Sequence, residues 1–354
     1  MNIDRSAPVL VTGGNGYIAS WLVKYLLEDG IDVHATVRDP SNDTKVGHLQ
    51  QIAKGAPGTL TLFQADLLDD GAFDEAMAGC ELVFHTASPF VMFGIKDPQK
   101  ELVDPAVEGT RNALESANRV SSVKRVVLTS SVVSIYGDAV DLQRNGTDVL
   151  TEDDWNTTSS LAHQPYSFSK VQAERAAWEI AEAQNRWDLV VINPGFVLGP
   201  SLTTASSSAT FDTMKQFYDG RLRMGAPSIE LGVVDVRDVA QAHLKAGYTP
   251  AASGRNICVS RSMTFLEIGR ALAGAYGRRY PFPRRELPKP LVWLAAPTAG
   301  VTHKYVSNNV GYPLKFDNSR ALEVLGVEFR PVEDTVVDHF QQLIDDGIVR
   351  DKRT

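Results

Sequence analysis

Tyr166 and Lys170, four residues apart, could together perform acid–base chemistry. On a helix this spacing places both side chains on one face. A free phenol ionises at about pH 10, and a neighbouring ammonium favours the phenolate, which would draw the pKa of Tyr166 toward the working range. Lys170 could also hold a ribose. Because the spacing alone is common on protein surfaces, its meaning depends on the elements around it.

Two adjacent serines, Ser130 and Ser131, follow the apolar run Val126–Thr129. In doubly wound sheets ligands bind beyond the carboxyl ends of the strands, so a hydroxyl at this place could hold a carbonyl oxygen. Both serines are candidates, and capping of the following loop is the alternative. His85 ends another apolar run without a partner at a recognisable spacing, and we expect it to be a packing residue.

A glycine-rich turn, Thr12–Ala19, lies between a predicted strand and a predicted helix. Gly13 would allow a tight turn, Gly16 a close approach of the backbone to a pyrophosphate, and Ala19 close packing of the helix on the strand. The helix N-terminus would present N–H groups and a positive dipole end to the phosphates. The turn predicts a dinucleotide site formed by Thr12, Gly13, Asn15, Gly16, Tyr17 and Ile18.

The second predicted strand ends in Arg38, where an NAD site would carry an acid for the ribose hydroxyls. A guanidinium matches a 2′-phosphate, and Lys45 could add a second charge, so NADP(H) is the expected cofactor. A solvated Arg38 and an Asp39 that still reaches the ribose are the alternatives. Asp66 and Leu67 follow the third strand as candidate adenine contacts, with helix capping by Asp66 as the alternative.

The elements that must position these residues alternate along the first two-thirds of the chain. Short apolar runs separated by helical patterns indicate βαβ units around a parallel sheet. The first helix is expected at Tyr17–Glu28, with Gly30 as its left-handed cap. Strands are expected at Val9–Val11, Asp32–Val37, Thr59–Phe63, Glu81–His85, Arg125–Thr129 and Leu189–Asn193.

After Pro200 the alternation becomes irregular, with a Ser/Thr-rich loop at Thr203–Thr210. Strands are expected to return to the sheet at Leu231–Val236 and Arg255–Val259. Helices are expected near Phe211–Tyr218, Phe265–Ala275, Arg320–Leu325 and Thr335–Asp346. The pattern predicts an α/β fold: a doubly wound parallel sheet from residues 1–199 and 231–260, and a smaller, mostly helical C-terminal substrate lobe from residues 200–230 and 261–354.

Composition excludes several other classes of protein. Hydrophobic residues make up 43% and charged residues 22% of the 354, as in ordinary globular proteins. The net charge of -8 gives no support to nucleic-acid or anionic-membrane binding. Cys80 and Cys258 are far apart and the seven histidines form no ligand pair, so no disulfide or metal site is expected. The start lacks a signal-peptide core and Leu291–Ala296 is too short to span a bilayer, which predicts a cytoplasmic protein.

Taken together, these motifs resemble the extended short-chain dehydrogenases/reductases, which have a Rossmann fold. Within them the chain is most similar to the dihydroflavonol reductase, cinnamoyl-CoA reductase and yeast methylglyoxal (carbonyl) reductase group. The resemblance is nearly full length. It is carried by Val11–Trp21, Ala35–Pro40, Phe84–Pro89, Glu108–Thr110, Leu128–Ser131, Tyr166–Lys170, Asn193–Pro200 and Val234–Ala240.

The resemblance implies a reversible NADPH-dependent reductase of aldehydes or ketones. It assigns Ser131 to hold the carbonyl oxygen, Tyr166 to donate the proton and Lys170 to activate the tyrosine. It assigns Arg38 and Lys45 to the 2′-phosphate. Further cofactor contacts are implied at Thr86, Ala87, Ser88, Pro194, Gly195 and Val197.

Large hydrophobic residues near the strand ends predict a compact, mostly apolar carbonyl substrate, bound between the sheet and the lobe. The candidate contacts besides Ser131 are Phe90, Phe93, Tyr136, Phe196, Phe211 and Met214. Phe211, Met214 and Phe217 repeat at helical spacing, so core packing is their alternative. The chain is expected to act as a monomer or homodimer.

The chain departs from the group at two places. Cinnamoyl-CoA reductases carry a longer Asn-Trp-Tyr-x-Tyr-x-Lys segment at the active tyrosine, whereas this chain reads His-Gln-Pro-Tyr-Ser-Phe-Ser-Lys at residues 163–170. Flavonoid reductases place an asparagine where Tyr136 stands. Neither a CoA thioester nor a dihydroflavonol is therefore expected. Two rival functions are a nucleotide-sugar epimerase or dehydratase that holds NAD tightly, and a non-catalytic NADP-sensing regulator, which generally lacks the Tyr–Lys pair.

Overall fold

A computed structural model of the protein describes residues 1–88, 95–204 and 209–353. Its main body is a seven-stranded sheet in the order β3-β2-β1-β4-β5-β6-β9, in which every neighbouring pair is parallel. The strand order reverses between β1 and β4, the point where such sheets bind ligands. The strands are β1 (Val9–Thr12), β2 (Val33–Val37), β3 (Leu60–Gln64), β4 (Leu82–His85), β5 (Arg125–Thr129), β6 (Asp188–Pro194) and β9 (Gly254–Cys258).

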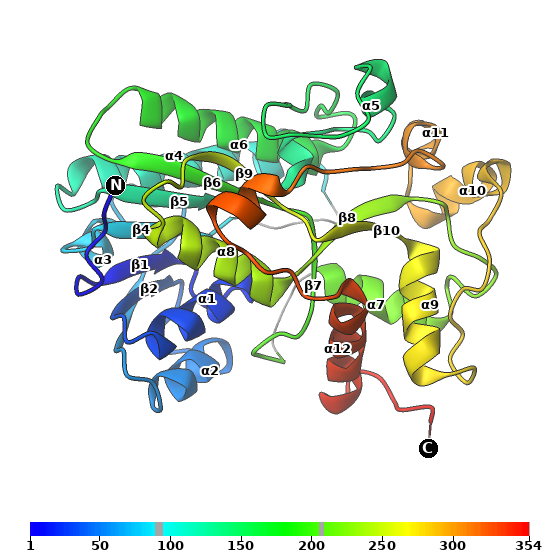
Figure 1. The fold of residues 1–354 in the computed structure, drawn as a ribbon, viewed down its shortest axis with the longest axis horizontal. Coiled ribbons are helices and arrows are strands. Elements are labelled where there is room, and N and C mark those ends of the chain that lie inside the picture. Colours follow the sequence, from blue (N-terminus) through cyan, green and yellow to red (C-terminus); the bar gives the residue numbers. More distant parts are fainter. Residues whose placement is uncertain (89–94, 205–208, 354) are drawn as a thin grey trace.

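Helices cover both faces of this sheet (Figure 1). The helices α1 (Tyr17–Glu28), α2 (Asp43–Ala53) and α8 (Val236–Tyr248) pack on one face, and α3 (Asp74–Met77), α4 (Asp104–Arg119) and α6 (Pro165–Glu182) on the other. Neighbouring residues of β1 point to opposite faces: Val9 and Val11 join one core cluster and Leu10 the other. β1 is thus buried on both faces, which is why its sequence is a continuous apolar run.

The first helix begins and ends as the sequence predicts. α1 spans Tyr17–Glu28 and buries Leu22, Leu26 and Leu27, while Gly30 takes a positive φ of 76° just beyond its end. A left-handed residue at this place closes the helix, and glycine adopts that conformation without a steric cost.

A second, smaller sheet forms the centre of the lobe. Its order is β10-β8-β7, from Arg261–Thr264, Glu230–Asp235 and Phe196–Leu198. Around it pack α7 (Ala209–Asp219), α9 (Phe265–Tyr276) and α12 (Val332–Asp345). Beyond these lie α10 (Lys289–Ala295) and α11 (His303–Asn309), and α5 (Asp141–Arg144) follows β5.

Three parts of the predicted lobe boundary are wrong. Leu231–Val236 does not return to the main sheet, because β8 pairs with β7 and β10; the return consists of α8 and β9. The lobe begins at β7, before residue 200. The short helical segment Arg320–Val324, predicted to lie in the lobe, packs on the main sheet instead, because Ala321 belongs to the core cluster of that sheet.

In the described part of the chain, no helix combines the length and the apolar character needed to cross a bilayer.

Candidate active site

The glycine turn joins the end of β1 to the end of β4. Gly13 has a φ of 64°, and a Cβ there would lie 3.1 Å from the Cα and Cβ of Ala87. Thr12 Oγ1 accepts hydrogen bonds from the N–H groups of Thr86 and Ala87, each at 3.1 Å. The turn is therefore held against the segment that carries Ser88, and only a residue without a side chain fits at Gly13.

His85 stabilises the same junction. It is buried, and burial lowers its pKa to about 4, so the ring is neutral at physiological pH. Its Nδ1 lies 2.9 Å from Thr12 Oγ1, which can donate to it while accepting from the two backbone groups. His85 is thus a packing residue, as the sequence predicts.

Gly14, to which the sequence analysis assigned no role, is the second tight contact of the turn. A Cβ at Gly14 would lie 2.8 Å from the Cβ of Ala35, on β2. At the following helix, the N-cap residue Gly16 has no side chain, so no side-chain cap covers the first N–H groups of α1. A helix start without a cap can bind a phosphate through those N–H groups.

The candidate 2′-phosphate residues are both exposed. Arg38 follows β2 directly, and Lys45 lies in the first turn of α2. Among the described residues neither side chain has an ion-pair partner. Asp39, the alternative ribose ligand, instead accepts hydrogen bonds from the N–H and Oγ of Ser41 at 3.0 and 2.6 Å, and these bonds lower its pKa. This arrangement fits a phosphate better than a ribose hydroxyl pair.

Asp66 caps a turn rather than a helix. Its Oδ1 accepts from the N–H of Leu68 at 3.0 Å, and α3 begins only at Asp74. The helix-capping alternative is therefore wrong. Leu67 packs on α4, where a Cβ at Gly109 would lie 2.3 Å from its Cγ.

The Tyr–Lys pair lies in the first half of α6, next to the glycine turn. Lys170 Nζ donates a hydrogen bond of 2.8 Å to Ser88 Oγ and lies 5.8 Å from the centre of the Tyr166 ring. Lys170 and Ser88 line one small pocket, with His85, Ala87, Thr110, Leu128, Thr129, Ser130, Ala173 and Glu174.

Burial, and not the lysine, dominates the protonation of Tyr166. It raises the pKa of Tyr166 to about 12, opposite to the shift expected from the neighbouring ammonium. Burial also lowers the pKa of Lys170 to about 8, and the Glu174 carboxylate opposes that shift. At neutral pH the phenol is thus protonated and can act as a proton donor.

The structure separates the two candidate serines. Ser130 is buried and donates its hydroxyl proton to Glu174. Ser131 is half-buried; its Oγ accepts from the N–H of Val133 at 3.3 Å and lies 3.5 Å from the carbonyl oxygen of Pro194. The capping role is real, since Ser131 begins the helical turn Val132–Ser134. Ser131 is nevertheless the serine whose hydroxyl is not committed to a buried carboxylate.

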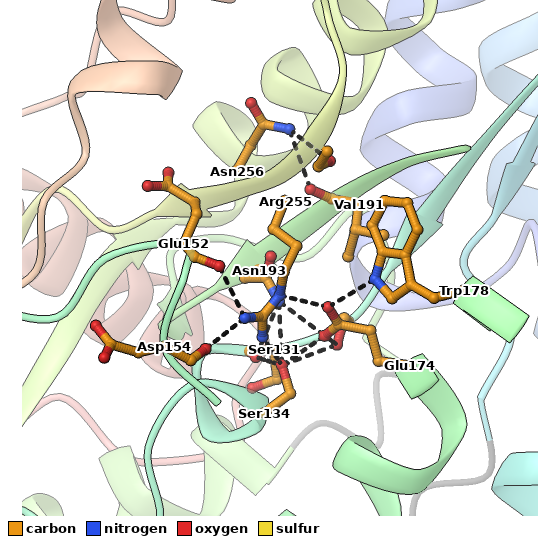
Figure 2. A network of polar contacts seen from close by, with 12 residues as sticks. Ser131, Ser134, Glu152, Asp154, Glu174, Trp178, Val191, Asn193, Arg255 and Asn256 are labelled. Carbon is orange, nitrogen blue, oxygen red and sulfur yellow. Dashed lines mark hydrogen bonds and ion pairs between the residues drawn. The ribbon is translucent and has the colours of Figure 1, made fainter. Parts of the chain in front are cut away.

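A buried ion pair between Glu174 and Arg255, which the sequence analysis did not identify, lies next to Ser131 and Ser134 (Figure 2). Arg255 Nε donates to Glu174 Oε1 at 2.6 Å, and Glu174 Oε2 accepts from Ser134 Oγ at 2.5 Å and from Asn193 Nδ2 at 3.0 Å. The pair joins α6 to β6, β9 and the turn after β5. Glu174 could have been suspected from its place one turn after Lys170, in an alanine-rich stretch of helix.

The predicted substrate residues fall into three groups. Phe90 and Phe93 lie outside the described residues. Tyr136 and Phe196 are half-buried, and the Tyr136 ring packs edge to face on Phe316 at 5.7 Å. Phe211, Met214 and Phe217 are buried in the core of the lobe, with Met214 and Phe217 fully inaccessible. The structure thus places these three in the core-packing role that was their alternative.

Near the end of β6, close packing explains Gly195. A Cβ at this glycine would lie 2.1 Å from the carbonyl oxygen of Gly232, so the residue is needed where β7 passes β8. Its neighbours Pro194 and Val197 lie in β6 and β7. No group of His, Cys, Asp or Glu among the described residues could hold a metal ion.

A doubly wound parallel sheet with a glycine turn at its switch point and a Tyr–Lys pair beside that turn defines a Rossmann-fold oxidoreductase. A family model described as the NAD dependent epimerase/dehydratase family matches residues 9–259. The chain belongs to this family, which comprises the extended short-chain dehydrogenases/reductases.

Three relatives show where the chain lies within the family. Cinnamoyl-CoA reductase CAD2 of Medicago truncatula is 37% identical over 95% of both chains. Anthocyanidin reductase of Arabidopsis thaliana is 37% identical over 78% of this chain and 81% of its own. The crystal structure of Gre2 from Candida albicans, solved with NADPH, superposes with a TM-score of 0.76 at 27% identity, over 96% of this chain and 99% of Gre2.

Proposed function

We propose that the protein is an NADPH-dependent reductase that converts an aldehyde or ketone into an alcohol, reversibly. The observation that carries the proposal is the bond from Lys170 to Ser88, next to Ala87, on which Gly13 packs. It places the Tyr–Lys pair directly beside the dinucleotide turn. The relatives named as reductases support the same reaction class.

The residues present fit a phosphorylated dinucleotide. The uncapped start of α1 would hold the pyrophosphate, Arg38 and Lys45 the 2′-phosphate, and Lys170 the ribose next to the nicotinamide. When bound, the nicotinamide supplies the hydride. The NADPH in Gre2 supports the phosphorylated form of the cofactor.

The chain itself supplies the proton and the polarising groups. As a carbon–hydrogen bond forms at the carbonyl carbon, the π electrons move onto the oxygen, and this oxygen takes the proton of the Tyr166 hydroxyl. Ser131 donates a hydrogen bond that strengthens as charge develops on the oxygen. The Lys170 ammonium stabilises the tyrosinate left behind, which regains a proton from solvent.

The proposed substrate is compact and mostly apolar and lies between the carboxyl edge of the main sheet and the lobe. Support comes from Tyr136 and Phe196, which are half-buried on segments that follow β5 and β6. Phe211 and Met214 add no support, because they are buried in the lobe core. A CoA thioester remains unfavoured by the His163–Lys170 segment, although cinnamoyl-CoA reductases are among the relatives.

The experiment is NADPH oxidation by the purified protein against small and aryl ketones, aldehydes, a UDP-sugar and an aromatic CoA thioester. Activity that rises with apolar bulk supports the proposal, since each methylene in an apolar pocket is worth roughly 1–3 kcal/mol. Turnover of the sugar nucleotide alone, with NAD retained through purification, would instead identify an epimerase or dehydratase. NADPH binding without any turnover would identify a sensor.

A further inference from the structure

The chain enters α6 through an unusual backbone conformation. Gln164, two residues before Tyr166, has φ 55° and ψ 57°. Among the described residues it is the one non-glycine with a positive φ. A glutamine rarely adopts this left-handed conformation, which is strained and persists only where the surroundings hold it. The start of the helix that carries Tyr166 is therefore fixed by contacts of its own.

Those contacts come from the Gln164 side chain and from the preceding turn. Gln164 Nε2 donates to the carbonyl oxygen of Gly137 and to Asp138 Oδ1, each at 2.7 Å. Its own carbonyl oxygen accepts from the N–H of Phe168 at 3.0 Å. Before it, Ser160 and His163 pair through two backbone hydrogen bonds of 2.8 and 3.1 Å. The amide of Gln164 thus ties the first turn of α6 to the segment after Tyr136.

Asp138 is the centre of this cluster. It is buried, and its carboxylate accepts from Asn308 Nδ2 and Asn309 Nδ2, each at 2.7 Å, as well as from Gln164. His163 Nε2 lies 2.9 Å from Asp138 Oδ2. Both oxygens of the carboxylate are therefore satisfied by side chains from separate parts of the chain.

Two of these partners come from the end of α11. Besides binding the carboxylate, Asn309 Oδ1 accepts from the N–H of Ala139 at 2.9 Å, and the carbonyl oxygen of Asn308 accepts from the N–H of Val140 at 3.0 Å. α11 is thus attached to the segment around Asp138 by four hydrogen bonds, and that segment is attached to the start of α6 by Gln164.

We propose that Gln164 and Asp138 are positioning residues that set the place of the Tyr166 hydroxyl, and that Asn308 and Asn309 make this place depend on the seating of α11. The inference rests on the proposed role of Tyr166 as proton donor. Tyr166 lies in the first turn of α6, which is held by the carbonyl oxygen and the side-chain amide of Gln164. A rotation at Gln164 would therefore move the phenol. Displacement of a reacting group by about 1 Å can cost roughly a hundredfold in rate.

The test separates the backbone of Gln164 from its amide. Glycine adopts the left-handed conformation freely, so Gln164→Gly removes the side chain while the backbone can keep its path. Asparagine tolerates that conformation and carries an amide, so Gln164→Asn should rescue part of the loss. Gln164→Ala loses both features. Gln172→Ala, about two turns further along α6, is the matched control.

We expect Gln164→Gly to lower kcat by at least about tenfold, with the Kd for NADPH within about twofold of wild type and the melting temperature nearly unchanged. Gln164→Asn should recover kcat in part, and Gln172→Ala should resemble wild type. Asn308→Ala should lower kcat severalfold with the same Kd for NADPH, because it removes one of the two hydrogen bonds that α11 donates to the Asp138 carboxylate.

Three outcomes would overturn the inference. One is a wild-type kcat in Gln164→Gly in a preparation where Tyr166→Phe is inactive. Another is a parallel loss of kcat and melting temperature without rescue by Gln164→Asn, which would make the cluster merely structural. A wild-type kcat in Asn308→Ala would remove the coupling to α11. If Tyr166→Phe itself were active, the proposed function would fail instead, and the two failures are thereby distinguished.

Discussion

Lys170 Nζ and Ser88 Oγ form a hydrogen bond of 2.8 Å that joins α6 to the segment following β4. These residues are 82 positions apart in the chain. The bond joins the helix that carries Tyr166 to the segment that packs on the glycine turn. Because Ala87 packs on Gly13 on the other side, a shift of the glycine turn would move Ser88 and with it the ammonium.

Tyr166→Phe should lower kcat by at least about a hundredfold, since a positioned general acid contributes about 10²–10⁴-fold. Only the hydroxyl is removed, so the Kd for NADPH should stay near that of wild type. Steady-state kinetics and a fluorescence titration with NADPH measure the two effects. Tyr218→Phe, which removes a hydroxyl from α7 in the lobe, is the control. Retention of most activity by Tyr166→Phe would place the proton donor elsewhere.

The Lys170 charge should be lost as the pH rises through about 8, because burial lowers its pKa to about that value. In the proposed mechanism the ammonium, present below this pH, holds the ribose and stabilises the tyrosinate, and the neutral amine above it would do so less well. Affinity for NADPH and kcat should therefore both fall between about pH 7 and 9. Lys170→Met should lower both at every pH. A kcat and a Kd for NADPH that stay constant across this range would contradict the prediction.

Much of the main fold could be predicted because its signals are local. Strands buried on both faces read as continuous apolar runs, and the 3.6-residue period together with Gly30 marks both ends of α1. The pairing of a strand is not local. The run at β8 predicts a strand whichever sheet it joins, and only its contacts with β7 and β10 assign it to the lobe.

In the candidate site, too, the local signals could be predicted from the sequence and the long-range contacts could not. Tyr166 and Lys170 are four residues apart, and their spacing is visible in the sequence. Glu174 and Arg255 are 81 residues apart, and no local pattern links them. Helical spacing also cannot tell a core from a cleft, which is why Met214 was a candidate substrate contact although it is fully buried.

Arg38→Ala should reduce the preference for NADPH over NADH by roughly tenfold or more. A charge-assisted hydrogen bond is worth about 1.5–3 kcal/mol, and Arg38 is the exposed guanidinium directly after β2. The ratio of kcat/KM for the two cofactors measures the effect. Lys54→Ala, which removes an exposed cation at the other end of α2, should leave the ratio unchanged. Equal use of both cofactors by the wild-type protein would refute the assignment of Arg38 to the 2′-phosphate.

Breaking the Glu174–Arg255 pair should destabilise the protein strongly. Both side chains are buried, so removing one leaves the other without an oppositely charged partner, which typically costs about 3–5 kcal/mol. Arg255→Met should therefore lower the free energy of unfolding in urea by about that amount, and Glu174→Gln by a similar amount.

The double variant Glu174→Gln with Arg255→Met tests whether the unpaired charge causes this loss. It leaves no unpaired charge, so it should be less destabilised than the sum of the two single variants. Exposed Arg111→Met, which removes a surface ion pair with Glu179, is the control and should cost less than about 1 kcal/mol. Strictly additive effects in the cycle would show that the two residues stabilise the site independently, through their separate contacts with Ser134, Asn193 and the carbonyl oxygen of Glu152.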